Sequence, residues 1–294
     1  MKEIVVLSGK GGTGKTSITG SFAALGAENL VLADCDVDAA DMHLLTMPQV
    51  EVEEDFYSGK TAEILTEGCV HCFKCQKVCH FDAIEVTSGE FVVDPMECEG
   101  CGYCYQVCPT HTIEMKPRLA GKFYISKTRF NNTLVHARLG IAADNSGKLV
   151  TKVRESAAAL AEKQNIDYVL VDASPGIGCP VVASLTGANL VVLVTEPTVS
   201  GLHDLSRVYE LVQKLKIKTV CIINKADLNI EMSNKIKAFL QEKQIDLLAE
   251  MPYDVKFTEA ITIGKTIVEY DTGELSERLK KSWDKVMHLL EEMT

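Results

Sequence analysis

Eight of the eleven cysteines in this 294-residue chain fall into two runs with the same spacing. Both runs read Cys-x-x-Cys-x-x-Cys-x-x-x-Cys. Two residues between ligands allow a tight turn to direct three thiolates at one cuboid iron–sulfur cluster, and the fourth cysteine of each run then binds the other cluster. The spacing therefore predicts two [4Fe-4S] clusters, the first held by Cys69, Cys72, Cys75 and Cys108, and the second by Cys98, Cys101, Cys104 and Cys79.

A pair of zinc sites is the alternative, because Cys-x-x-Cys repeats also bind zinc. A zinc site uses four ligands per ion and has no need of a fourth cysteine three residues further on, so the spacing favours the clusters. Thiolate-bound clusters require a reducing compartment, and we therefore expect a cytoplasmic protein.

A second group of residues has the spacing of a phosphate-binding loop. The sequence GKGGTGKT fits the pattern G-x-x-x-x-G-K-[ST] and lies between an apolar strand and a helix. Backbone N–H groups of such a loop surround phosphate oxygens, and the positive end of the following helix faces them. Lys15 is expected at the β- and γ-phosphates, and the Thr16 hydroxyl on Mg²⁺. The predicted nucleotide contacts in this loop are Gly9, Lys10, Gly11, Gly12, Thr13, Gly14, Lys15, Thr16 and Ser17.

Acidic residues that follow two other apolar strands complete the predicted hydrolytic site. Asp36 and Asp38 follow the second strand, and Asp172 ends a later one. Carboxylates at these places orient the attacking water or hold magnesium through water. We expect Asp36 to orient the water, with Asp38 as a second candidate. The predicted magnesium site consists of Thr16, Asp36 and Asp172.

The lysine at the second position of the loop is more specific than the general pattern. GKGGTGKT resembles the deviant loop of the MinD/Mrp/nitrogenase-iron-protein class of ATPases. In that family the extra lysine reaches the nucleotide of a second subunit. The resemblance implies that Lys10 is catalytic in a nucleotide-sandwich dimer, formed with a second copy or a close homologue. The alternative is a solvent-exposed loop lysine.

The same resemblance implies roles for residues further along the chain. The sequence ASPG, ending at Gly176, resembles the second switch, whose glycine N–H senses the γ-phosphate. NKAD, beginning at Asn224 and Lys225, resembles the base-recognition segment, and Pro252 and Tyr253 are expected to close over the base. NKAD also resembles the guanine-selecting N-K-x-D of GTPases, so ATP is favoured by the family and not by these residues.

An α/β framework must position these side chains. The predicted strands are 3–8, 30–33, 168–172, 191–194, 220–223 and 246–249, and the predicted helices are 15–26, 149–163, 201–215 and 231–242. Their alternation predicts a doubly wound, mostly parallel sheet with ligands at the carboxyl ends of its strands. Residues 121–126 and 133–138 are expected to form an antiparallel hairpin beside the main sheet, with its turn at Asn131 and Asn132.

The cysteine block interrupts this alternation as an insertion. We expect a discontinuous P-loop ATPase domain, 1–59 and 117–294, and an inserted α+β domain, 60–116, that resembles bacterial two-cluster ferredoxins. A repeat of about 29 residues within the insertion indicates one helix and one short strand in each half. The other three cysteines, Cys35, Cys179 and Cys221, are expected to be buried or half-buried.

Composition argues against two classes of partner. A net charge of −11 disfavours nucleic acid, and no apolar run approaches the roughly twenty residues needed to span a bilayer. The carboxyl-terminal stretch 274–293 is amphipathic. Its polar face mixes acids and bases, which favours packing against the body over membrane targeting.

Together these features predict an iron–sulfur ATPase in which ATP-driven switching of a dimer is coupled to electron transfer, with an unidentified redox protein as partner. An iron–sulfur cluster carrier of the Mrp type is one alternative. The lack of a terminal Cys-x-x-Cys pair outside the insertion counts against it. A MinD-like positioning ATPase is another, and the missing basic terminal helix weakens it.

Overall fold

The computed structural model describes residues 1–140 and 146–293, which form two compact units. The large unit contains the described residues of Met1–Glu54, Phe123–Arg138 and Ser146–Thr294, and the cysteine unit contains those of Asp55–Lys122 and Leu139–Asn145. The predicted insertion, 60–116, lies within the cysteine unit. The predicted range 117–294 includes residues 141–145 and 294, which lie outside the described residues.

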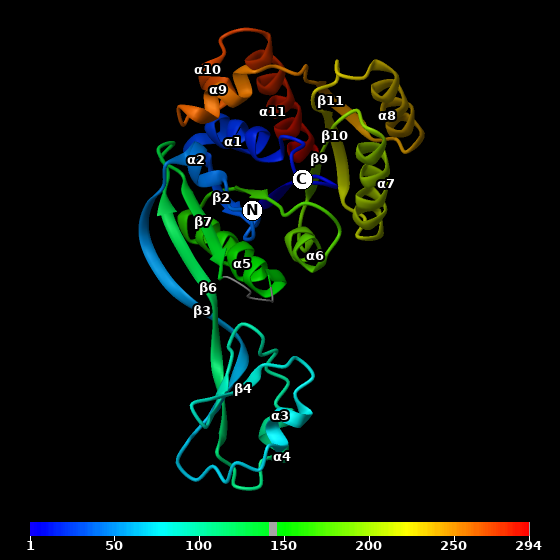
Figure 1. Ribbon diagram of the computed structural model, residues 1–294. Helices are drawn as coiled ribbons and strands as arrows, with labels where there is room; N and C mark the ends of the chain where they lie inside the picture. Colours follow the sequence, from blue (N-terminus) through cyan, green and yellow to red (C-terminus); the bar gives the residue numbers. More distant parts are fainter. Residues whose placement is uncertain (141–145, 294) are drawn as a thin grey trace. The chain divides into compact units, whose positions relative to one another are not determined.

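The strands are β1 (Lys2–Leu7), β2 (Leu30–Asp34), β3 (Gln49–Ile64), β4 (Ile84–Thr87), β5 (Glu90–Val93), β6 (Ile113–Lys127), β7 (Thr133–Leu139), β8 (Tyr168–Asp172), β9 (Leu190–Thr195), β10 (Lys218–Ile223) and β11 (Asp246–Glu250). Over the described residues, nine strands form one sheet in the order β11-β10-β9-β1-β8-β2-β7-β6-β3 (Figure 1). Its pairs from β11 to β7 are parallel. This order brings the carboxyl ends of β1, β2 and β8 together.

The helices are α1 (Lys15–Gly26), η1 (Ala27–Asn29), α2 (Met42–Thr46), α3 (Lys74–Val78), α4 (Tyr103–Val107), α5 (Ser146–Gln164), α6 (Cys179–Leu185), α7 (Val199–Lys214), α8 (Ile230–Glu242), α9 (Lys256–Thr262), α10 (Ile267–Tyr270) and α11 (Glu274–Glu292). In the large unit, α1 and α11 lie on one side of the sheet, and α5 and α6 on the other (Figure 1). Among the described helices, none has the length and apolar character required to cross a bilayer.

The main core lies between the sheet and the α1–α11 layer. Ile4 and Val6 of β1 are fully buried there with Phe22 of α1. Trp283 of α11 lies with its ring centroid 5.2 Å from that of Phe22. Leu279, one turn before Trp283, is also fully buried. The prediction that the carboxyl-terminal helix packs against the body is therefore confirmed.

The predicted strands and helices of the large unit are present, with ends that differ by a few residues. The turn after β6 is closed by the Thr128 N–H, which donates to the Asn132 carbonyl at 3.0 Å, and Asn131 adopts a φ of 63°. This turn joins β6 to β7, and β7 pairs with β2, so the predicted hairpin is part of the main sheet.

Strand β3 is not among the predicted elements. Its sequence, QVEVEEDFYSGKTAEI, contains few apolar residues, and most of its side chains are exposed. Without a buried face, the period-two alternation that identifies a strand is weak.

The cysteine unit contains two similar halves. Helix α3 begins after Phe73 (φ 61°, ψ 4°), and α4 begins after Gly102 (φ 74°, ψ 8°), so the two preceding residues share a left-handed conformation. Cys79 and Cys108 directly follow these helices, and their dihedral angles also agree closely. Strands β4 and β5 form an antiparallel hairpin after α3. The prediction had only one short strand in this half.

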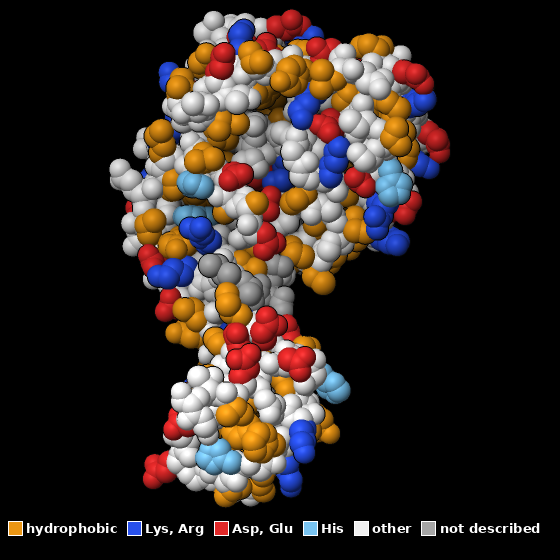
Figure 2. Space-filling view, in the orientation of Figure 1, with side chains coloured by type: hydrophobic (Ala, Val, Ile, Leu, Met, Phe, Trp, Pro, Cys, Tyr) orange, Lys and Arg blue, Asp and Glu red, His pale blue; other side chains and the backbone are white. Residues whose placement is uncertain are grey.

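A small core holds the cysteine unit together. Ala83, Ile84, Phe91 and Ile113 are buried with Cys75, Cys98 and Cys104. The surface carries both hydrophobic and acidic side chains on the face visible in Figure 2. The exposed hydrophobic side chains of this unit include Val70, Phe73, Phe81, Met96, Tyr103 and Tyr105.

Candidate functional site

A cavity of about 490 Å³ lies in the large unit where the phosphate loop follows β1. Residues 11–17 of the loop form one wall, and Asp36 and Asp38 form another. Ser174 and Pro175 also contribute. The structure thus brings the predicted phosphate loop and the carboxylates of Asp36 and Asp38 to one cavity.

Backbone conformation explains the glycines of the loop. Gly12 and Gly14 have φ values of 77° and 90°, in the region that side chains other than glycine rarely adopt. A Cβ atom on Gly14 would also lie 2.3 Å from Nδ2 of Asn224. That amide donates to the Thr13 carbonyl at 2.8 Å, so the asparagine supports the loop from the end of β10.

Lys15 points to the carboxylates and is nearly buried, with 6% of its side chain exposed. Its Nζ lies 2.9 Å from Oδ1 of Asp172 and 3.5 Å from Oδ2 of Asp36. Burial lowers the pKa of Lys15, but the nearby carboxylates outweigh it and leave the pKa raised. Burial raises the pKa of Asp36, and the Lys15 charge opposes that effect. The ammonium is therefore held charged at the position where phosphate is expected.

Asp172 is the centre of this polar network. The Thr16 hydroxyl donates to its Oδ2 at 2.9 Å, which joins two of the three residues predicted to hold magnesium. The Thr19 hydroxyl donates to Oδ1 at 2.8 Å. Thr19 was not predicted as a site residue. Its spacing of three from Thr16 on a helix is the signal that places both hydroxyls on one face.

Asp34 is a further residue that sequence reasoning missed. It ends β2 directly beside Asp172 on β8, and its Oδ1 accepts the Asp36 N–H at 3.1 Å. Burial, reinforced by the Asp172 charge, raises the pKa of Asp34 well above its usual range. Asp34 thus fixes the backbone that presents Asp36.

Gly176, whose N–H is predicted to sense the γ-phosphate, is hydrogen-bonded within the chain. The Gly176 N–H donates to the Ser8 carbonyl at 2.9 Å. The Ser174 hydroxyl donates to the Cys35 carbonyl at 2.7 Å. These bonds hold the segment after β8 against the residues that follow β1 and β2, and Gly176 is not among the described residues that line the cavity.

The predicted base-side residues also lie outside the lining that the described residues form. Both ends of the Asn224 amide are bonded, because its Oδ1 accepts the Lys225 N–H at 3.0 Å. The Tyr253 N–H, next to Pro252, donates to Oδ1 of Asp227 at 2.6 Å, and the Tyr253 side chain is exposed. The base contacts remain predictions.

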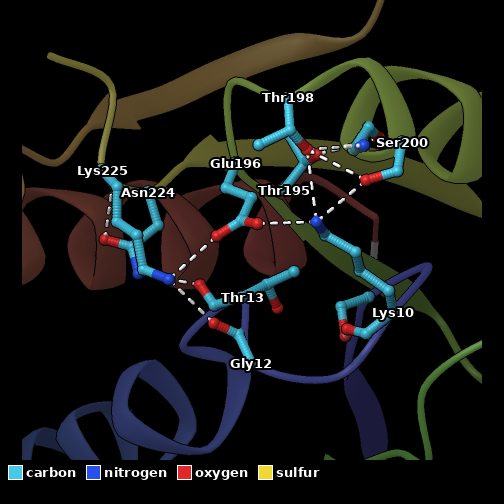
Figure 3. Close-up of polar contacts among 11 residues, drawn as sticks. Lys10, Gly12, Thr13, Thr195, Glu196, Thr198, Ser200, Asn224 and Lys225 are labelled. Carbon is cyan, nitrogen blue, oxygen red and sulfur yellow. Dashed lines mark hydrogen bonds and ion pairs between the residues drawn. The ribbon is translucent and has the colours of Figure 1, made fainter. Parts of the chain in front are cut away.

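Lys10 takes part in a second polar network, with residues that follow β9 (Figure 3). Its Nζ lies 2.6 Å from Oε1 of Glu196, and it donates to the hydroxyls of Thr198 at 3.2 Å and Ser200 at 3.0 Å. Burial raises the pKa of Glu196, but hydrogen bonds from Lys10 and Lys225 outweigh it and leave the pKa lowered. Glu196 was not predicted; its place directly after an apolar strand is the signal.

Each predicted set of four cysteines lines its own cavity in the cysteine unit. The first cavity is lined by Cys69, Cys72, Cys75 and Cys108, and the second by Cys79, Cys98, Cys101 and Cys104. Over the described residues, no three His, Cys, Asp or Glu side chains converge as the ligands of a single metal ion do.

Hydroxyl groups surround the last cysteine of the second run. Sγ of Cys108 lies 3.5 Å from Oγ1 of Thr112 and 3.7 Å from Oγ1 of Thr110. Burial raises the pKa of Cys108, but hydrogen bonds from Thr112 and Thr110 outweigh it and lower the pKa to about 7. This environment favours the thiolate, which is the form that binds metals.

The three remaining cysteines differ in exposure. Cys35 and Cys221 are fully buried, as expected. The expectation for Cys179 is wrong, because this residue is exposed. It begins α6, just before Pro180, where the chain reaches the surface.

Comparisons with known proteins agree with this fold. The sequence profile of the CobQ/CobB/MinD/ParA nucleotide binding domain matches residues 4–267. An uncharacterized protein of Methanocaldococcus jannaschii is 29% identical over 291 residues, with 98% of this chain and 97% of the relative covered. The iron-sulfur cluster carrier protein of Pyrococcus horikoshii is 23% identical over 304 residues, with 99% of this chain and 87% of the relative covered.

Among solved structures, the septum site-determining protein MinD complexed with Mg-ADP from Pyrococcus horikoshii is similar with a TM-score of 0.59. The sequences are 21% identical, and the match covers 98% of this chain and 97% of that chain. Together with the sheet order, this likeness confirms the mostly parallel α/β fold of a P-loop NTPase.

Proposed function

This chain belongs to the CobQ/CobB/MinD/ParA nucleotide-binding domain family, and on that premise we propose that it is a MinD/Mrp-type ATPase that couples nucleotide state to electron transfer through two [4Fe-4S] clusters. It acts as a dimer of two copies or of the chain with a close homologue, in the cytoplasm. Its redox partner is a protein, and neither nucleic acid nor membrane insertion is involved.

The cavity at the phosphate loop supports ATP and Mg²⁺ as ligands. Loop N–H groups and the Lys15 ammonium suit phosphate oxygens, and Thr16 and Asp172 already share a hydrogen bond at the proposed metal position. Asp36 borders the same cavity and would orient the attacking water. Magnesium bound here neutralises the charge that develops on the phosphates.

The grouping of the cysteines is the observation that carries the redox part of the proposal. Eight cysteines separated by up to 39 positions in sequence line two cavities, four to each, in the crossed pattern of a two-cluster protein. The donor set fits, since thiolates are the usual ligands of such clusters. When bound, each cluster accepts and releases one electron.

Coupling between the two activities rests on the path of the chain. The chain enters β3 at Gln49, 11 positions after Asp38, and returns by β6 to a turn that contacts α2. Rearrangement of the segment that contains Asp36 and Asp38 on ATP binding would therefore act on the segments that lead to and from the cysteine unit.

The test uses an anaerobically purified Lys15→Ala variant beside the wild type. ATP hydrolysis and the rate of cluster reduction by a chemical reductant are measured with and without Mg-ATP. We expect the wild type to hydrolyse ATP and to change its reduction rate with nucleotide, and the variant to do neither. Lys235→Ala, an exposed lysine on α8, is the control. Equal reduction rates with and without ATP in the wild type would remove the coupling.

An iron–sulfur cluster carrier is the second candidate, because a relative with that name aligns over 99% of this chain. A carrier gives up its cluster, so incubation with an apo-ferredoxin should transfer iron. Clusters that stay bound through many rounds of ATP hydrolysis would support the electron-transfer role instead.

A further inference from the structure

Glu196 joins two lysines of the phosphate-loop region through its two carboxylate oxygens. It directly follows β9, and its Oε1 lies 2.6 Å from Nζ of Lys10. Its Oε2 lies 2.8 Å from Nζ of Lys225, which also donates to the Gly12 carbonyl at 2.9 Å. Figure 3 shows the carboxylate between the two ammonium groups.

The Lys10 ammonium has no unused donor in this arrangement. An ammonium has three N–H groups, and three acceptors surround this one: Glu196, Thr198 and Ser200. All three belong to the same subunit as the lysine. Lys10 is therefore held in cis, and 28% of its side chain is exposed.

The position of Lys10 would be unfavourable without Glu196. Thr198 is the N-cap of α7, because its hydroxyl accepts the Gly201 N–H at 2.9 Å, and Ser200 lies in the first turn. The amino-terminal end of a helix carries partial positive charge, which repels a cation and attracts an anion. The Glu196 carboxylate supplies that anion, so the two hydroxyls alone would hold Lys10 only weakly.

Close packing of Gly9 against Asp204 fixes the position of the first residue of the phosphate loop. A Cβ atom on Gly9 would lie 2.5 Å from Cβ of Asp204 and 2.7 Å from its backbone carbon. The loop thus runs directly against α7, and the next residue, Lys10, reaches Glu196 without extending to a second subunit.

We propose that Glu196 is a positioning residue that withholds Lys10 from the partner subunit until a nucleotide phosphate there competes for the ammonium. This inference rests on the proposed function, in which Lys10 acts across a dimer. Because Glu196 also pairs with Lys225, and Lys225 holds the Gly12 carbonyl, release of Lys10 changes the support of the loop within its own subunit. Glu196 therefore sets the threshold for dimer formation.

Glu196→Gln tests this directly, since glutamine keeps the shape and removes the charge. With Mg²⁺ and a non-hydrolysable ATP analogue, sedimentation velocity gives the protein concentration at which half of the chains are dimeric. We expect that concentration to fall by about two- to tenfold, the range that a partly exposed ion pair supports. Glu231→Gln is the matched control, because Glu231 pairs with Lys235 at the same 2.6 Å on α8. An unchanged or higher concentration in Glu196→Gln would overturn the proposal.

A double variant separates a role through Lys10 from a general effect on the fold. In a Lys10→Ala background, Glu196→Gln should have no further effect on dimerisation. An equal effect in both backgrounds would overturn the proposal. If Glu196→Gln does not fold, Ser200→Ala removes one Lys10 acceptor and should shift dimerisation in the same direction by a smaller factor. No shift in Ser200→Ala would then count against the proposal.

Failure of the proposed function has a different signature. If Lys10→Ala hydrolyses ATP and dimerises as the wild type does, Lys10 has no role across a dimer, and the premise fails. If Lys10→Ala hydrolyses ATP more slowly and dimerises only at a higher protein concentration, but Glu196→Gln matches the wild type, only the role of Glu196 fails.

Discussion

The ammonium of Lys15 and the carboxylate of Asp172 lie 2.9 Å apart, so the residue expected at phosphate and the residue expected at magnesium are paired with each other. Only 6% and 1% of these side chains are exposed. Nucleotide binding must therefore replace the Lys15–Asp172 ion pair by contacts of Lys15 with phosphate and of Asp172 with magnesium. The exchange is possible because Thr16 and Thr19 already hold the carboxylate in place.

Asp172→Asn should lower the free energy of unfolding by about 3 kcal/mol, because it leaves the buried Lys15 charge with Asp36 alone. ATP hydrolysis should be lost as well. Urea denaturation measures the first effect and phosphate release the second. Asp246→Asn, which removes a carboxylate 3.6 Å from the exposed Lys218, is the control and should change stability by less than about 0.5 kcal/mol. Equal stability of Asp172→Asn and the wild type would contradict the network.

Gly14→Ala should abolish nucleotide binding and destabilise the fold by about 2 kcal/mol. The alanine would meet Nδ2 of Asn224 and would have to adopt a φ of 90°. Isothermal titration with Mg-ADP and thermal unfolding give the two quantities. Gly11→Ala is the matched change in the same loop, since no atom lies within 4 Å of the added Cβ. Comparable loss of stability in both variants would show that the Asn224 contact is unimportant.

The crossed cysteine pairing makes a specific prediction for iron content. Cys75→Ser/Cys108→Ser removes two ligands of one proposed cluster and should leave about four iron atoms per chain out of about eight. Cys75→Ser/Cys79→Ser removes one ligand from each cluster and should disturb both. Cys221→Ser, fully buried on β10, should retain all the iron. The pairing is wrong if the first double variant loses both clusters and the second keeps one.

Glu269→Gln should lower stability at neutral pH by about 0.5–1 kcal/mol, since this carboxylate is partly exposed and binds the Arg129 guanidinium at 2.5 and 2.6 Å. Burial raises the pKa of Glu269, but hydrogen bonds from Arg129 and Thr266 outweigh it and leave the pKa lowered. A lowered pKa stabilises the folded state above the unfolded value of 4.5, and this contribution disappears as the pH falls through the folded value.

The difference in thermal midpoint between Glu269→Gln and the wild type should therefore shrink below pH 4.5. Glutamine preserves the capping box with Thr266, so the helix start serves as an internal control. A difference that persists unchanged at pH 3 would show that charge is not the cause.

Trp283→Ala should cost about 3–5 kcal/mol, because the indole is 92% buried against Phe22. Denaturant unfolding measures the loss. Asp284→Ala, the exposed neighbour on the same helix, should be nearly neutral. A small effect of Trp283→Ala would mean that α11 is only loosely attached, as a membrane-seeking helix would be.

Much of the large unit was predictable because its strands are buried on both faces. Runs such as Val191 to Val194 are continuous and apolar, and glycines or acidic residues mark the ends of these runs. The type and the order of the secondary-structure elements could therefore be predicted from the sequence. Strand β3 was missed because its exposed, acidic residues carry no such signal. Its place in the sheet depends on pairing with β6, which is not encoded locally.

The residues of the candidate site likewise fall into two groups, those that local sequence patterns predicted and those that they did not. The phosphate loop, Asp36 and Asp172 were predictable because each belongs to a short local sequence pattern: a glycine-rich loop, or an acidic residue at the end of an apolar strand. Thr19 and Glu196 were not, since each acts through a partner far away in sequence. Asp34 was not, because its surroundings depend on the pairing that places it beside Asp172. The Glu196 carboxylate becomes informative only when folding places it beside Lys10, 186 positions earlier.

Arg129 lies in the turn directly after β6, and its side chain bonds to two helices at once. Its Nε donates to the Leu45 carbonyl of α2 at 2.8 Å, while its guanidinium holds Glu269 of α10. Leu45 is also part of the cavity wall. Strand β6, which follows the last cysteine, therefore ends in a turn whose arginine holds a residue that lines the cavity proposed for ATP. A displacement at one end of β6 can thus be transmitted to the other end.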